Sequence, residues 1–396
     1  MSSQRPDHPS TRAGPHAARK TADAVPIAFA EAGSGLGGSA QSLLRILAAL
    51  RRDAPDRLAP TVLCAHQAGV ELFRGHGFTA QRIHGSGLVA RYREMRRLLA
   101  ATGARVLHCN NPPYDHIPHI LAARRSGVPV TVHYRVGRVL SRAERAVLAL
   151  VSHVFAVSER GAQAVRDQGW IAPGRVTRLD DGVDLDAYTG GPEARSAARA
   201  ALDLDERNFV LLLPATLQPG KGQDVAVDAA HMLARSDRDT CAGRAVWLFA
   251  GGEHYQAPGW RAVLEARIRD QGLAGEVHLL GHREDMPALL AAADAVALPS
   301  ELTEGTPCAI LEAFAAGRPV VAARTGAVPE AVDAQVGALV PPGDAAALAD
   351  AVARLWQDTQ LRARLGAAAR ARAQERYDVR RIAARLADTL VDLARA

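Results

Sequence analysis

Residues 300–322 read SELTEGTPCAILEAFAAGRPVVA and contain two glutamates, Glu304 and Glu312, eight positions apart. An apolar run typical of a buried strand, Ala295–Leu298, comes just before the stretch, and a second one, Pro319–Ala322, closes it. A strand, a helical pattern and a further strand in succession are the repeating unit of a parallel sheet covered by helices. The stretch therefore predicts an α/β fold.

The two glutamates lie on either side of a predicted helix start. Thr306 is a good N-cap residue, Pro307 suits the first helical position, and Gly317 suits the position after the last turn. Glu304 then lies in the loop, while Glu312 lies on the helix, roughly 9 Å along from Thr306 at about 1.5 Å per residue. The helix start offers unpaired N–H groups and a positive dipole end, which suit a phosphate. A nucleotide sugar, with a central diphosphate and hydroxyl-rich ends, fits this arrangement.

Strand-like runs and helical patterns alternate throughout the chain, and a polar stretch at 184–206 divides the alternation into two halves. We therefore expect two Rossmann-like, doubly wound domains facing a central cleft, with ligands beyond the carboxyl ends of the strands. The expected segments are a disordered tail at 1–24, an acceptor-side N-terminal domain at 25–185, a nucleotide-sugar-binding C-terminal domain at 186–379, and a helix at 380–396 that could pack on either domain, including back on the N-terminal one.

Ten strands are expected from the apolar runs. In the first half they are Val25–Ala30, Thr61–Ala65, Val106–Cys109, Val128–His133 and Val154–Val157. In the second half they are Phe209–Pro214, Val246–Ala250, Val277–Leu280, Ala295–Leu298 and Pro319–Ala322.

The composition is that of a globular protein, with 396 residues, 48% hydrophobic and 23% charged. Aromatic residues make up only 4%, and no nucleic-acid-binding module is present, so nucleic acid is not an expected partner. The four cysteines have no metal-ligand spacing and are interpreted as free thiols in a reducing compartment. No apolar run could span a bilayer, and residues 1–24 lack the apolar core of a signal peptide, so a cytoplasmic protein is expected.

Charge is distributed unevenly. Residues 1–200 carry 27 Lys+Arg against 16 Asp+Glu, whereas residues 201–396 carry 21 against 26. A predicted helix with Arg93, Arg96 and Arg97 could hold the N-terminal domain on anionic lipid headgroups, peripheral to the inner face of a plasma membrane. An ordinary solvated arginine face is the alternative.

Two loops between a strand and a helix could approach a phosphate. Lys221, in the run LPATLQPGKGQD, could neutralise phosphate as a point cation. A surface lysine is the alternative, but only one other lysine, Lys20, is present in the chain. The run GSGLGG at 33–38 formally matches G-x-G-x-x-G, yet the next predicted strand does not end in the acidic residue that a dinucleotide site requires. A glycine loop whose backbone approaches phosphate or sugar is the better interpretation.

Polar residues also end the strands of the first half. His133 closes its strand and could hydrogen-bond a sugar hydroxyl or a phosphate, although a lone histidine is more often structural. Asn110 and Asn111 end the preceding strand, and with Arg135 they are the expected acceptor-side residues.

Together these segments resemble the retaining glycosyltransferases of family 4, which have the GT-B architecture, from about Val25 to the C-terminus. The stretch with Glu304 and Glu312 matches the family's E-x7-E signature. The other matching blocks, in the family's order, are GG at 37–38, the strand-end His133, AVSE at 156–159, DGVD at 181–184 where the family usually has NGVD, PGKG at 219–222, LFAGGE at 248–253 and VHLLG at 277–281.

The resemblance implies a role for each matched residue. Glu304 would contact hydroxyls of the donor sugar, Glu312 the ribose diol, and Lys221 the diphosphate, while His133 would lie near the reacting sugar. The implied catalytic residues are His133, Lys221 and Glu304. The implied donor-binding residues are Gly37, Gly38, Thr216, Lys221, Glu304, Gly305, Thr306, Cys308 and Glu312.

One position departs from the family pattern. The family usually has Gly-Arg-Leu five residues before the lysine, and here Ala215, Thr216 and Leu217 stand in its place. A lost charged hydrogen bond to phosphate is worth about 1.5–3 kcal/mol. Another arginine could substitute, diphosphate affinity could be weaker, or activity could be altered.

The resemblance implies transfer of a sugar from a nucleotide-diphosphate sugar with retained configuration and with no cofactor or metal. The expected acceptor is a lipid-linked or polysaccharide intermediate of bacterial cell-surface glycan synthesis, such as exopolysaccharide or lipopolysaccharide. A small-molecule acceptor of secondary metabolism and a non-catalytic nucleotide-sugar-binding protein are the alternatives. Two D-x-D pairs, Asp184/Asp186 and Asp203/Asp205, lie in the predicted linker and are interpreted as chance matches to the motif of metal-dependent glycosyltransferases.

Overall fold

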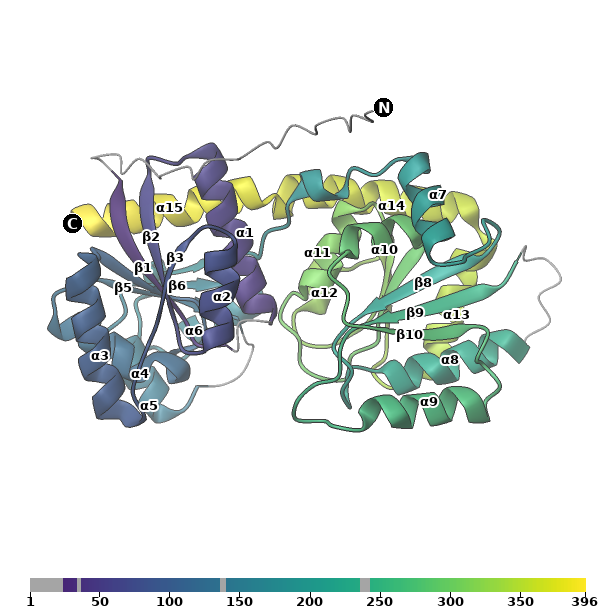
Figure 1. Ribbon diagram of the computed structural model, residues 1–396, viewed down its shortest axis with the longest axis horizontal. Coiled ribbons are helices and arrows are strands. Elements are labelled where there is room, and N and C mark those ends of the chain that lie inside the picture. Colours follow the sequence, from purple (N-terminus) through teal and green to yellow (C-terminus); the bar gives the residue numbers. More distant parts are fainter. Residues whose placement is uncertain (1–23, 34–36, 136–139, 236–242) are drawn as a thin grey trace, which may run out of the picture.

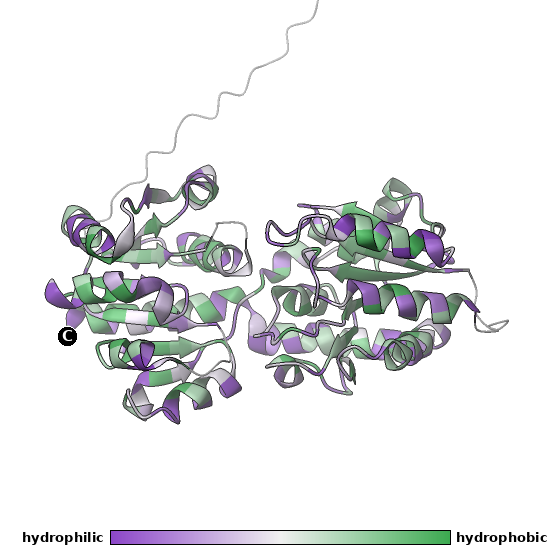
Figure 2. Cartoon of the chain, turned by 90° about the horizontal axis from the view of Figure 1, so that it is seen from below, coloured by the Kyte–Doolittle hydropathy of each residue, from purple (hydrophilic) through white to green (hydrophobic). Residues whose placement is uncertain are grey.

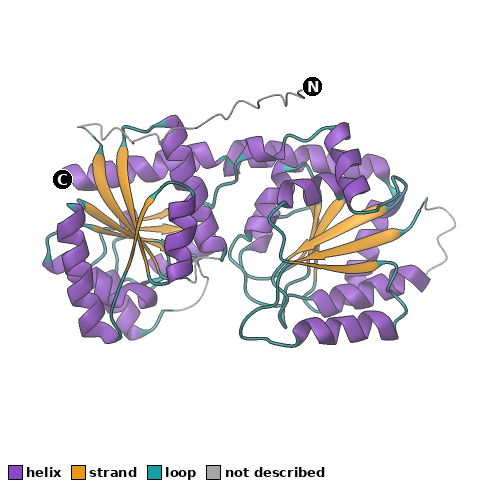
Figure 3. Ribbon diagram, viewed as in Figure 1, coloured by secondary structure: helices purple, strands orange, loops and turns teal. Residues whose placement is uncertain are grey.

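The computed structural model describes residues 24–33, 37–135, 140–235 and 243–396, which form two parallel sheets, one in each half of the chain (Figure 1). Helices flank both sheets (Figure 3). This confirms the α/β class and the two doubly wound sheets that the alternation predicted. The predicted tail up to residue 23, residues 34–36 of the glycine loop and Cys241 lie outside the described residues.

The N-terminal sheet has seven strands in the order β3-β2-β1-β4-β5-β6-β7. The strands are β1 (Val25–Glu31), β2 (Leu58–Cys64), β3 (Thr79–Arg82), β4 (Val106–Cys109), β5 (Val130–Tyr134), β6 (His153–Ala156) and β7 (Val176–Arg178). The intervening helices are α1 (Gly38–Asp53), α2 (Gln67–Gly75), α3 (Gly87–Thr102), α4 (Pro113–Arg125), α5 (Arg142–Leu148), α6 (Glu159–Arg166) and the short turn η1 (Pro173–Arg175). The winding of this sheet reverses between β1 and β4.

The C-terminal sheet has six strands in the order β10-β9-β8-β11-β12-β13 and reverses between β8 and β11. The strands are β8 (Phe209–Pro214), β9 (Ala245–Ala250), β10 (Val277–Gly281), β11 (Ala295–Leu298), β12 (Val320–Ala323) and β13 (Gly337–Val340). The helices before and among them are η2 (Leu185–Tyr188), α7 (Pro192–Ala201), α8 (Gln223–Arg235), α9 (Trp260–Asp270), α10 (Met286–Ala292), α11 (Cys308–Ala315), α12 (Val328–Ala331), α13 (Ala345–Gln357) and α14 (Thr359–Arg372).

All ten predicted strands are present, with ends that differ by up to three residues. Three further strands, β3, β7 and β13, were not predicted, and all three form sheet edges. They are only three or four residues long, and β3 (TAQR) and β7 (VTR) carry polar side chains because an edge strand is not enclosed on every side. Apolar runs therefore marked the interior strands and the edge strand β10, and missed the other three edge strands.

Each sheet is buried on both faces, as expected when helices cover both sides. In β1, Ile27 and Phe29 contribute to one hydrophobic cluster, while Ala28 and Ala30 contribute to another. This alternation follows the two-residue period of a strand. Figure 2 shows the hydrophobic residues gathered on the strands and on the helix faces that meet them. No helix of the described residues is long and apolar enough to cross a lipid bilayer.

The chain passes between the two halves twice. The first passage contains Gly182, where a Cβ atom would lie only 2.7 Å from Val379 Cα, so a larger residue would push the two passages apart. The second runs through a π-helical turn, η3 (Ala373–Tyr377), into α15 (Val379–Arg395), which lies along the N-terminal half (Figure 1). Helix α15 packs there on α1 and β1, and Leu386 and Leu390 join the cluster that contains Phe29.

Candidate active site

Predicted donor-binding and acceptor-side residues lie where the winding of each sheet reverses. The loops after β8 and β11 carry Lys221 and Glu304, and the segments after β1 and β4 carry Gly38 and Asn110. Doubly wound sheets bind ligands beyond the carboxyl ends of their strands at such reversal points. We call the surface where these two groups of loops meet the interdomain seam.

Lys221 and Glu304 are in direct contact. Lys221 Nζ lies 2.5 Å from Glu304 Oε1, and Ser300 Oγ donates to the same oxygen at 2.9 Å. The two charged side chains are 23% and 17% exposed, so a ligand in solvent could reach both. The turn beside Lys221 requires Gly222, which has a φ of +75° and leaves no room for a Cβ atom, 2.1 Å from the Pro299 carbonyl oxygen. Close packing of the two loops thus brings two predicted catalytic residues together.

Helix α11 begins one residue later than predicted, so Thr306 is not its N-cap. Pro307, at φ −59° and ψ 131°, is the N-cap residue, and Cys308 starts the helix without a side-chain cap. Thr306 Oγ1 instead lies 3.5 Å from the carbonyl oxygen of Val157 in the other domain, a contact that the local pattern does not reveal. Gly317 follows the helix with a φ of +66°, as predicted. The uncapped first N–H groups of α11 suit an anionic ligand.

The N-termini of α1 and α11 approach each other across the seam. Gly37 is the N-cap residue of α1, and Gly38 begins the helix. The Cys308 sulfur lies 3.9 Å from the Gly38 carbonyl oxygen. Burial, together with the charge of Asp181, raises the pKa of the Cys308 thiol to about 12, so this cysteine stays protonated. Two helix starts, each with unpaired N–H groups, therefore converge at the predicted phosphate seat.

Glu312 forms an ion pair with Arg45, which projects from α1 across the seam. Glu312 lies on α11, as predicted, and is buried there. Arg45 was not among the predicted site residues. No local signal could have identified it, because the two partners are 267 positions apart and arginine is the usual cation of this chain.

The N-terminal side of the seam carries a buried polar network. Arg135 Nε donates to the Asn110 carbonyl oxygen at 3.0 Å, and its Nη2 donates to Asn110 Oδ1 at 2.8 Å. Arg135 also pairs with Asp181, which accepts a hydrogen bond from Ser42 Oγ at 2.5 Å. The Arg135 and Asp181 side chains are only 10% and 8% exposed. Two predicted acceptor-side residues are therefore engaged with one another rather than turned to solvent.

His133 lies beneath Arg135 and is 0% exposed. Its Nδ1 is 3.3 Å from Arg135 Nη2, and its Nε2 is 3.3 Å from the Leu179 carbonyl oxygen. A guanidinium only donates, so Nδ1 accepts and Nε2 carries the proton donated to Leu179. Burial, then the charge of Arg135, lowers the pKa of His133 well below its usual value, so the imidazole is neutral. Contact between His133 and a sugar stays a prediction.

Glu31, at the end of β1, is a buried carboxylate that the sequence interpretation missed. It accepts hydrogen bonds from Asn110 Nδ2 at 2.5 Å and from the Gly33 N–H at 2.8 Å. Asn111 Oδ1 accepts from the Ala32 N–H at 2.9 Å. Both asparagines therefore hold the chain between β1 and α1. The position of Glu31 at the carboxyl end of a strand beside the reversal was the signal that could have identified it.

Thr216 and Gly305 lie on the C-terminal side of the seam. Thr216 is exposed after β8, and its carbonyl oxygen accepts from Gln223 Nε2 at 3.0 Å. Gly305 approaches the other domain so closely that a Cβ atom would be 3.0 Å from the Arg135 carbonyl oxygen. Neither position adds a charge to the site.

The D-x-D pair in the first passage between the domains has structural partners. Asp184 Oδ1 accepts from the Asp186 N–H at 3.2 Å, and Asp186 pairs with Arg380 of α15. Across the described residues, no group of three or more His, Cys, Asp or Glu side chains is placed to hold a metal ion.

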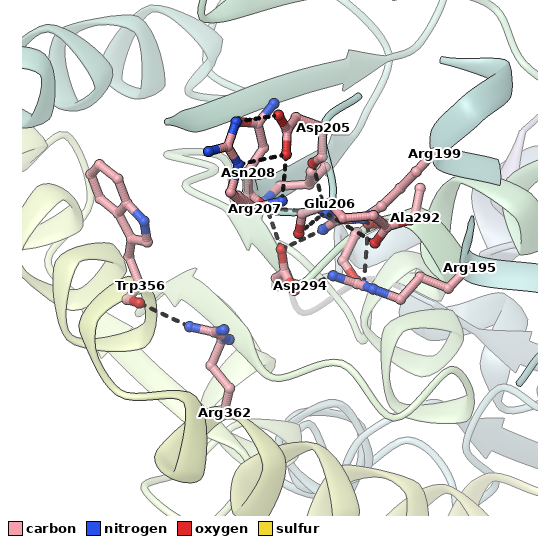
Figure 4. A network of polar contacts seen from close by, with 12 residues as sticks. Arg195, Arg199, Asp205, Glu206, Arg207, Asn208, Ala292, Asp294, Trp356 and Arg362 are labelled. Carbon is pink, nitrogen blue, oxygen red and sulfur yellow. Dashed lines mark hydrogen bonds and ion pairs between the residues drawn. The ribbon is translucent and has the colours of Figure 1, made fainter. Parts of the chain in front are cut away.

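A second polar network lies at the opposite end of the C-terminal sheet, before β8 and β11 (Figure 4). Asp294 accepts from Arg195 at 2.7 Å and from Arg199 at 2.8 Å, and Arg199 also donates to backbone carbonyls, including those of Ala292 and Asn208. These arginines secure α7 and α10 at the amino ends of the strands. The network is therefore remote from the edge at which doubly wound sheets bind ligands.

Two family models match the chain. The one described as Glycosyltransferase Family 4 matches residues 36–187, and the one described as Glycosyl transferases group 1 matches residues 208–358.

Curated relatives include a D-inositol 3-phosphate glycosyltransferase of Saccharomonospora viridis, 37% identical over 230 residues, which is 57% of this chain and 51% of the relative. A GDP-mannose-dependent alpha-(1-6)-phosphatidylinositol monomannoside mannosyltransferase of Mycolicibacterium smegmatis is 34% identical over 226 residues, 54% of this chain and 56% of that protein. The matched region thus spans about half the length of these relatives.

Solved structures cover almost the whole chain. The crystal structure of Alr3699/HepE from Anabaena in complex with UDP has a TM-score of 0.80 at 24% identity and covers 93% of this chain and 100% of that one. Sucrose-phosphate synthase from Thermosynechococcus elongatus has a TM-score of 0.76 at 20% identity and covers 93% and 99%. At these identities the similarity shows the fold, which is GT-B. The two family models, matched in order along this fold, show that the chain belongs to glycosyltransferase family 4.

Proposed function

We propose that the protein is a glycosyltransferase that moves a sugar from a nucleotide-diphosphate sugar to an acceptor, with retention of configuration and without a metal or other cofactor. The observation that carries the proposal is the contact between Lys221 and Glu304 beside the start of α11. A cation, a carboxylate and an uncapped helix start lie together there. These groups match the charged centre and the hydroxyl-bearing end of such a donor.

Lys221 and the α11 N–H groups would act on the diphosphate. The leaving diphosphate gains negative charge in the transition state, and fixed cations and dipoles at that point lower the barrier. Donor binding would exchange the Lys221–Glu304 contact for contacts with the ligand, leaving Glu304 to accept hydrogen bonds from the sugar. Ser300 would keep Glu304 oriented during that exchange. Glu312, one turn along α11, would accept from the ribose diol.

His133 and Arg135 would hold the residues of the N-terminal domain that face the sugar in place. His133 accepts from Arg135 Nη2, and Arg135 holds the Asn110 side chain and carbonyl oxygen. His133 in this arrangement acts through Arg135, as a positioning residue. A direct contact with the sugar would require the imidazole to leave both of its present partners.

We propose a lipid-linked or polysaccharide intermediate of bacterial cell-surface glycan synthesis as the acceptor. The relative named for a phosphatidylinositol mannoside supports this class. A small-molecule acceptor of secondary metabolism is the second candidate, and the relative named for D-inositol 3-phosphate, a small molecule without a lipid chain, supports it. Exposure of Thr216, where the family usually has a phosphate-binding arginine, keeps a non-catalytic nucleotide-sugar-binding protein as the third.

Helix α3 supports peripheral contact with an anionic membrane. Its first turn exposes Leu88 and Val89, 66% and 63% accessible, and its later turns carry Arg93, Arg96 and Arg97 around a surface hollow of about 500 Å³. Exposed apolar side chains beside cations are the features of a helix that lies in a headgroup layer. The proposed site of action is the cytoplasmic face of a membrane.

The donor experiment is a thermal-shift screen of UDP-, GDP- and ADP-sugars, followed by measurement of nucleotide release with and without acceptor glycans. A bound donor at a hundred times its dissociation constant should stabilise the protein by about 2.7 kcal/mol. Glu304→Gln keeps the side-chain shape and should reduce nucleotide release at least about tenfold. Stabilisation without any nucleotide release would favour the non-catalytic binder, and unchanged turnover in Glu304→Gln would contradict the site.

Two further measurements test the chemistry of the transfer. Nuclear magnetic resonance of the product tests retention of configuration, and activity in EDTA tests metal independence.

The membrane experiment measures sedimentation with vesicles of phosphatidylglycerol and phosphatidylcholine. Binding should weaken as salt rises and should fall when Arg93, Arg96 and Arg97 are replaced by glutamine, because each cation near an anionic surface contributes about 1 kcal/mol. Arg142→Gln and Arg175→Gln, at exposed positions outside α3, are the controls. Lack of binding at low salt would contradict peripheral contact.

A further inference from the structure

Arg45 is the one charged side chain of α1 that crosses the seam to a predicted donor-binding residue within the described residues. One of its terminal nitrogens, Nη2, bonds Glu312 Oε1. The other, Nη1, is buried and has no hydrogen-bond acceptor in the described part of the chain. An unmet buried donor costs about 1–3 kcal/mol, more for a charged group. In the guanidinium, Nη2 is therefore paired with Glu312, whereas Nη1 lacks an oxygen acceptor.

The neighbours of the Arg45 guanidinium come from two segments other than its own helix. Arg45 lies on α1, Glu312 and Cys308 on α11, and Tyr188 on the η2 turn that precedes the C-terminal sheet. Burial, together with the charge of Glu312, raises the pKa of the Tyr188 phenol, so this neighbour is neutral. Cys308 is also a neutral thiol, so Glu312 is the single ionised partner among these neighbours. A second, anionic or hydroxyl acceptor could join the guanidinium without displacing Glu312.

The charge balance of the seam leads to the same conclusion. Three cations of the seam that the structure describes each have a carboxylate partner: Lys221 has Glu304, Arg135 has Asp181, and Arg45 has Glu312. Arg135 is also committed to Asn110 through two hydrogen bonds. A diphosphate needs cations that can still donate, and of the two arginines Arg45 is the one with a free terminal nitrogen. Arginine can bond two acceptors at once because its donors form a planar fork.

We propose that Arg45 is a donor-binding residue supplied by the N-terminal domain: its Nη2 holds Glu312, while its Nη1 binds an oxygen of the ribose–phosphate part of the nucleotide. This inference rests on the proposed function and deepens it. It gives the N-terminal domain a side-chain contact to the nucleotide. The same guanidinium would then both bind the nucleotide and hold the two domains together through Glu312. It also supplies a cation to a site in which position 216 is threonine.

The test is isothermal titration of the full chain with UDP, GDP and ADP, and with uridine, guanosine and adenosine. Arg45→Gln should weaken binding of the preferred nucleoside diphosphate at least about tenfold, the factor that a lost charged hydrogen bond of about 1.5 kcal/mol produces. Arg52→Gln, on the same helix and also ion-paired, should stay within about twofold of the wild type. Arg45→Lys should recover only part of the loss, because an ammonium cannot keep the two-sided geometry.

The nucleosides identify the oxygen. A loss confined to the diphosphate assigns Nη1 to a phosphate oxygen, whereas an equal loss with the nucleoside assigns it to a ribose hydroxyl, and either result supports the proposal. Titration in the Glu312→Gln background separates direct binding from support of Glu312. If Arg45 contacts the nucleotide, Arg45→Gln weakens binding in that background too; if it only holds Glu312, the second change has no further effect and the proposal is overturned.

Two further outcomes decide the matter. Diphosphate binding by Arg45→Gln within twofold of the wild type, with an unchanged unfolding midpoint, overturns the role of Arg45 and leaves the proposed glycosyltransferase function standing. Failure of the wild-type protein to bind any of the three diphosphates, or any nucleotide sugar, overturns both. The Glu312→Gln, Arg45→Gln double variant has no unpaired carboxylate, so it keeps the comparison valid if Arg45→Gln alone is unstable.

Discussion

The two sides of the interdomain seam hold their charges in different ways. On the C-terminal side, Lys221 and Glu304 are partly exposed and rely mainly on each other, with one further hydrogen bond from Ser300. On the N-terminal side, Arg135 and Asp181 are nearly buried, and each has at least two partners. The first arrangement can be exchanged for a ligand at little cost, whereas the second cannot. Of these two ion pairs, the C-terminal one is therefore suited to bind a ligand, and the N-terminal one to hold the shape of its domain.

Lys221→Ala should have the largest effect on activity. Loss of a cation beside the developing charge of the leaving diphosphate should lower the turnover number about 10²–10³-fold, or roughly 3–4 kcal/mol, the scale found when one stabilising donor is removed. Because Lys221 is partly exposed, the unfolding free energy should change by less than about 1 kcal/mol. Nucleotide release and urea denaturation provide the two measurements.

Lys20→Ala is the matched control, since Lys20 is the only other lysine of the chain and lies outside the described residues. It should leave both measurements unchanged. A Lys221→Ala protein that is fully active but unstable would reverse the comparison and place the structural role on the C-terminal side.

Arg135→Leu should give the opposite result, with a large loss of stability. The change leaves Asp181 nearly buried without its ion-pair partner, and breaking such a pair costs about 3–5 kcal/mol. Urea denaturation should therefore show a lower midpoint at an unchanged slope.

Asp181→Asn in the Arg135→Leu background should recover most of that loss, because no buried charge is then left unpaired. Arg142→Leu, at an exposed position of α5, is the control. A small effect of Arg135→Leu on unfolding, together with a large effect on donor binding, would show that Arg135 belongs with Lys221 as a ligand-binding cation.

Acid should destabilise the protein through buried histidines of the N-terminal domain. His116 Nδ1 and His119 Nδ1 lie 3.0 Å apart, and burial lowers the pKa of His119 to about 4 and that of His116 well below its usual value. In the unfolded chain these histidines have an ordinary pKa of about 6.5, so below that pH the unfolded chain binds more protons than the folded protein does. The stabilisation is therefore complete above about pH 6.5 and decreases as the pH falls toward the lower pKa of the folded protein. Each such group contributes up to about 1.4 kcal/mol per pH unit.

The measurement is the urea-unfolding free energy between pH 7 and pH 5. His119→Gln should reduce the slope of this free energy against pH by the contribution of one histidine. His84→Gln, at an exposed position, is the control. A flat profile in the wild type would mean that the folded and unfolded states bind the same number of protons in this range, which would contradict the lowered pKa values of these histidines.

The sequence predicted the interior of the fold better than its edges. Interior strands such as β8 (FVLLLP) are buried on both faces and must be apolar throughout, so composition reveals them. The edge strand β3 (TAQR) carries two polar side chains and a threonine, and nothing in its pattern distinguishes it from a loop. The parallel ladder with β2 forms it, and that pairing is a property of the whole sheet.

The same distinction applies to the candidate site. Lys221, Glu304 and Glu312 could be predicted because each belongs to a local strand–loop–helix pattern. The pairing of Arg45 with Glu312 and the burial of His133 beneath Arg135 depend on how two domains and several strands meet. One arginine among many in this chain gives no local sign of which carboxylate it will reach, so such contacts had to await the structure.

Thr216→Arg should have the smallest effect and test whether the C-terminal side lacks a cation. An arginine at this exposed position should tighten nucleoside-diphosphate binding about threefold to tenfold, roughly 1 kcal/mol, because solvent screens the new charge. Titration calorimetry compares it with Thr216→Gln, which adds a polar side chain without the charge. If Thr216→Arg also restores binding to Arg45→Gln, the two arginines serve the same phosphate from opposite sides of the seam. Equal nucleoside-diphosphate affinity of Thr216→Arg and Thr216→Gln would show instead that a further positive charge at position 216 does not strengthen binding. The N-terminal side would then contribute more to nucleotide binding than the comparison of the two ion pairs suggests.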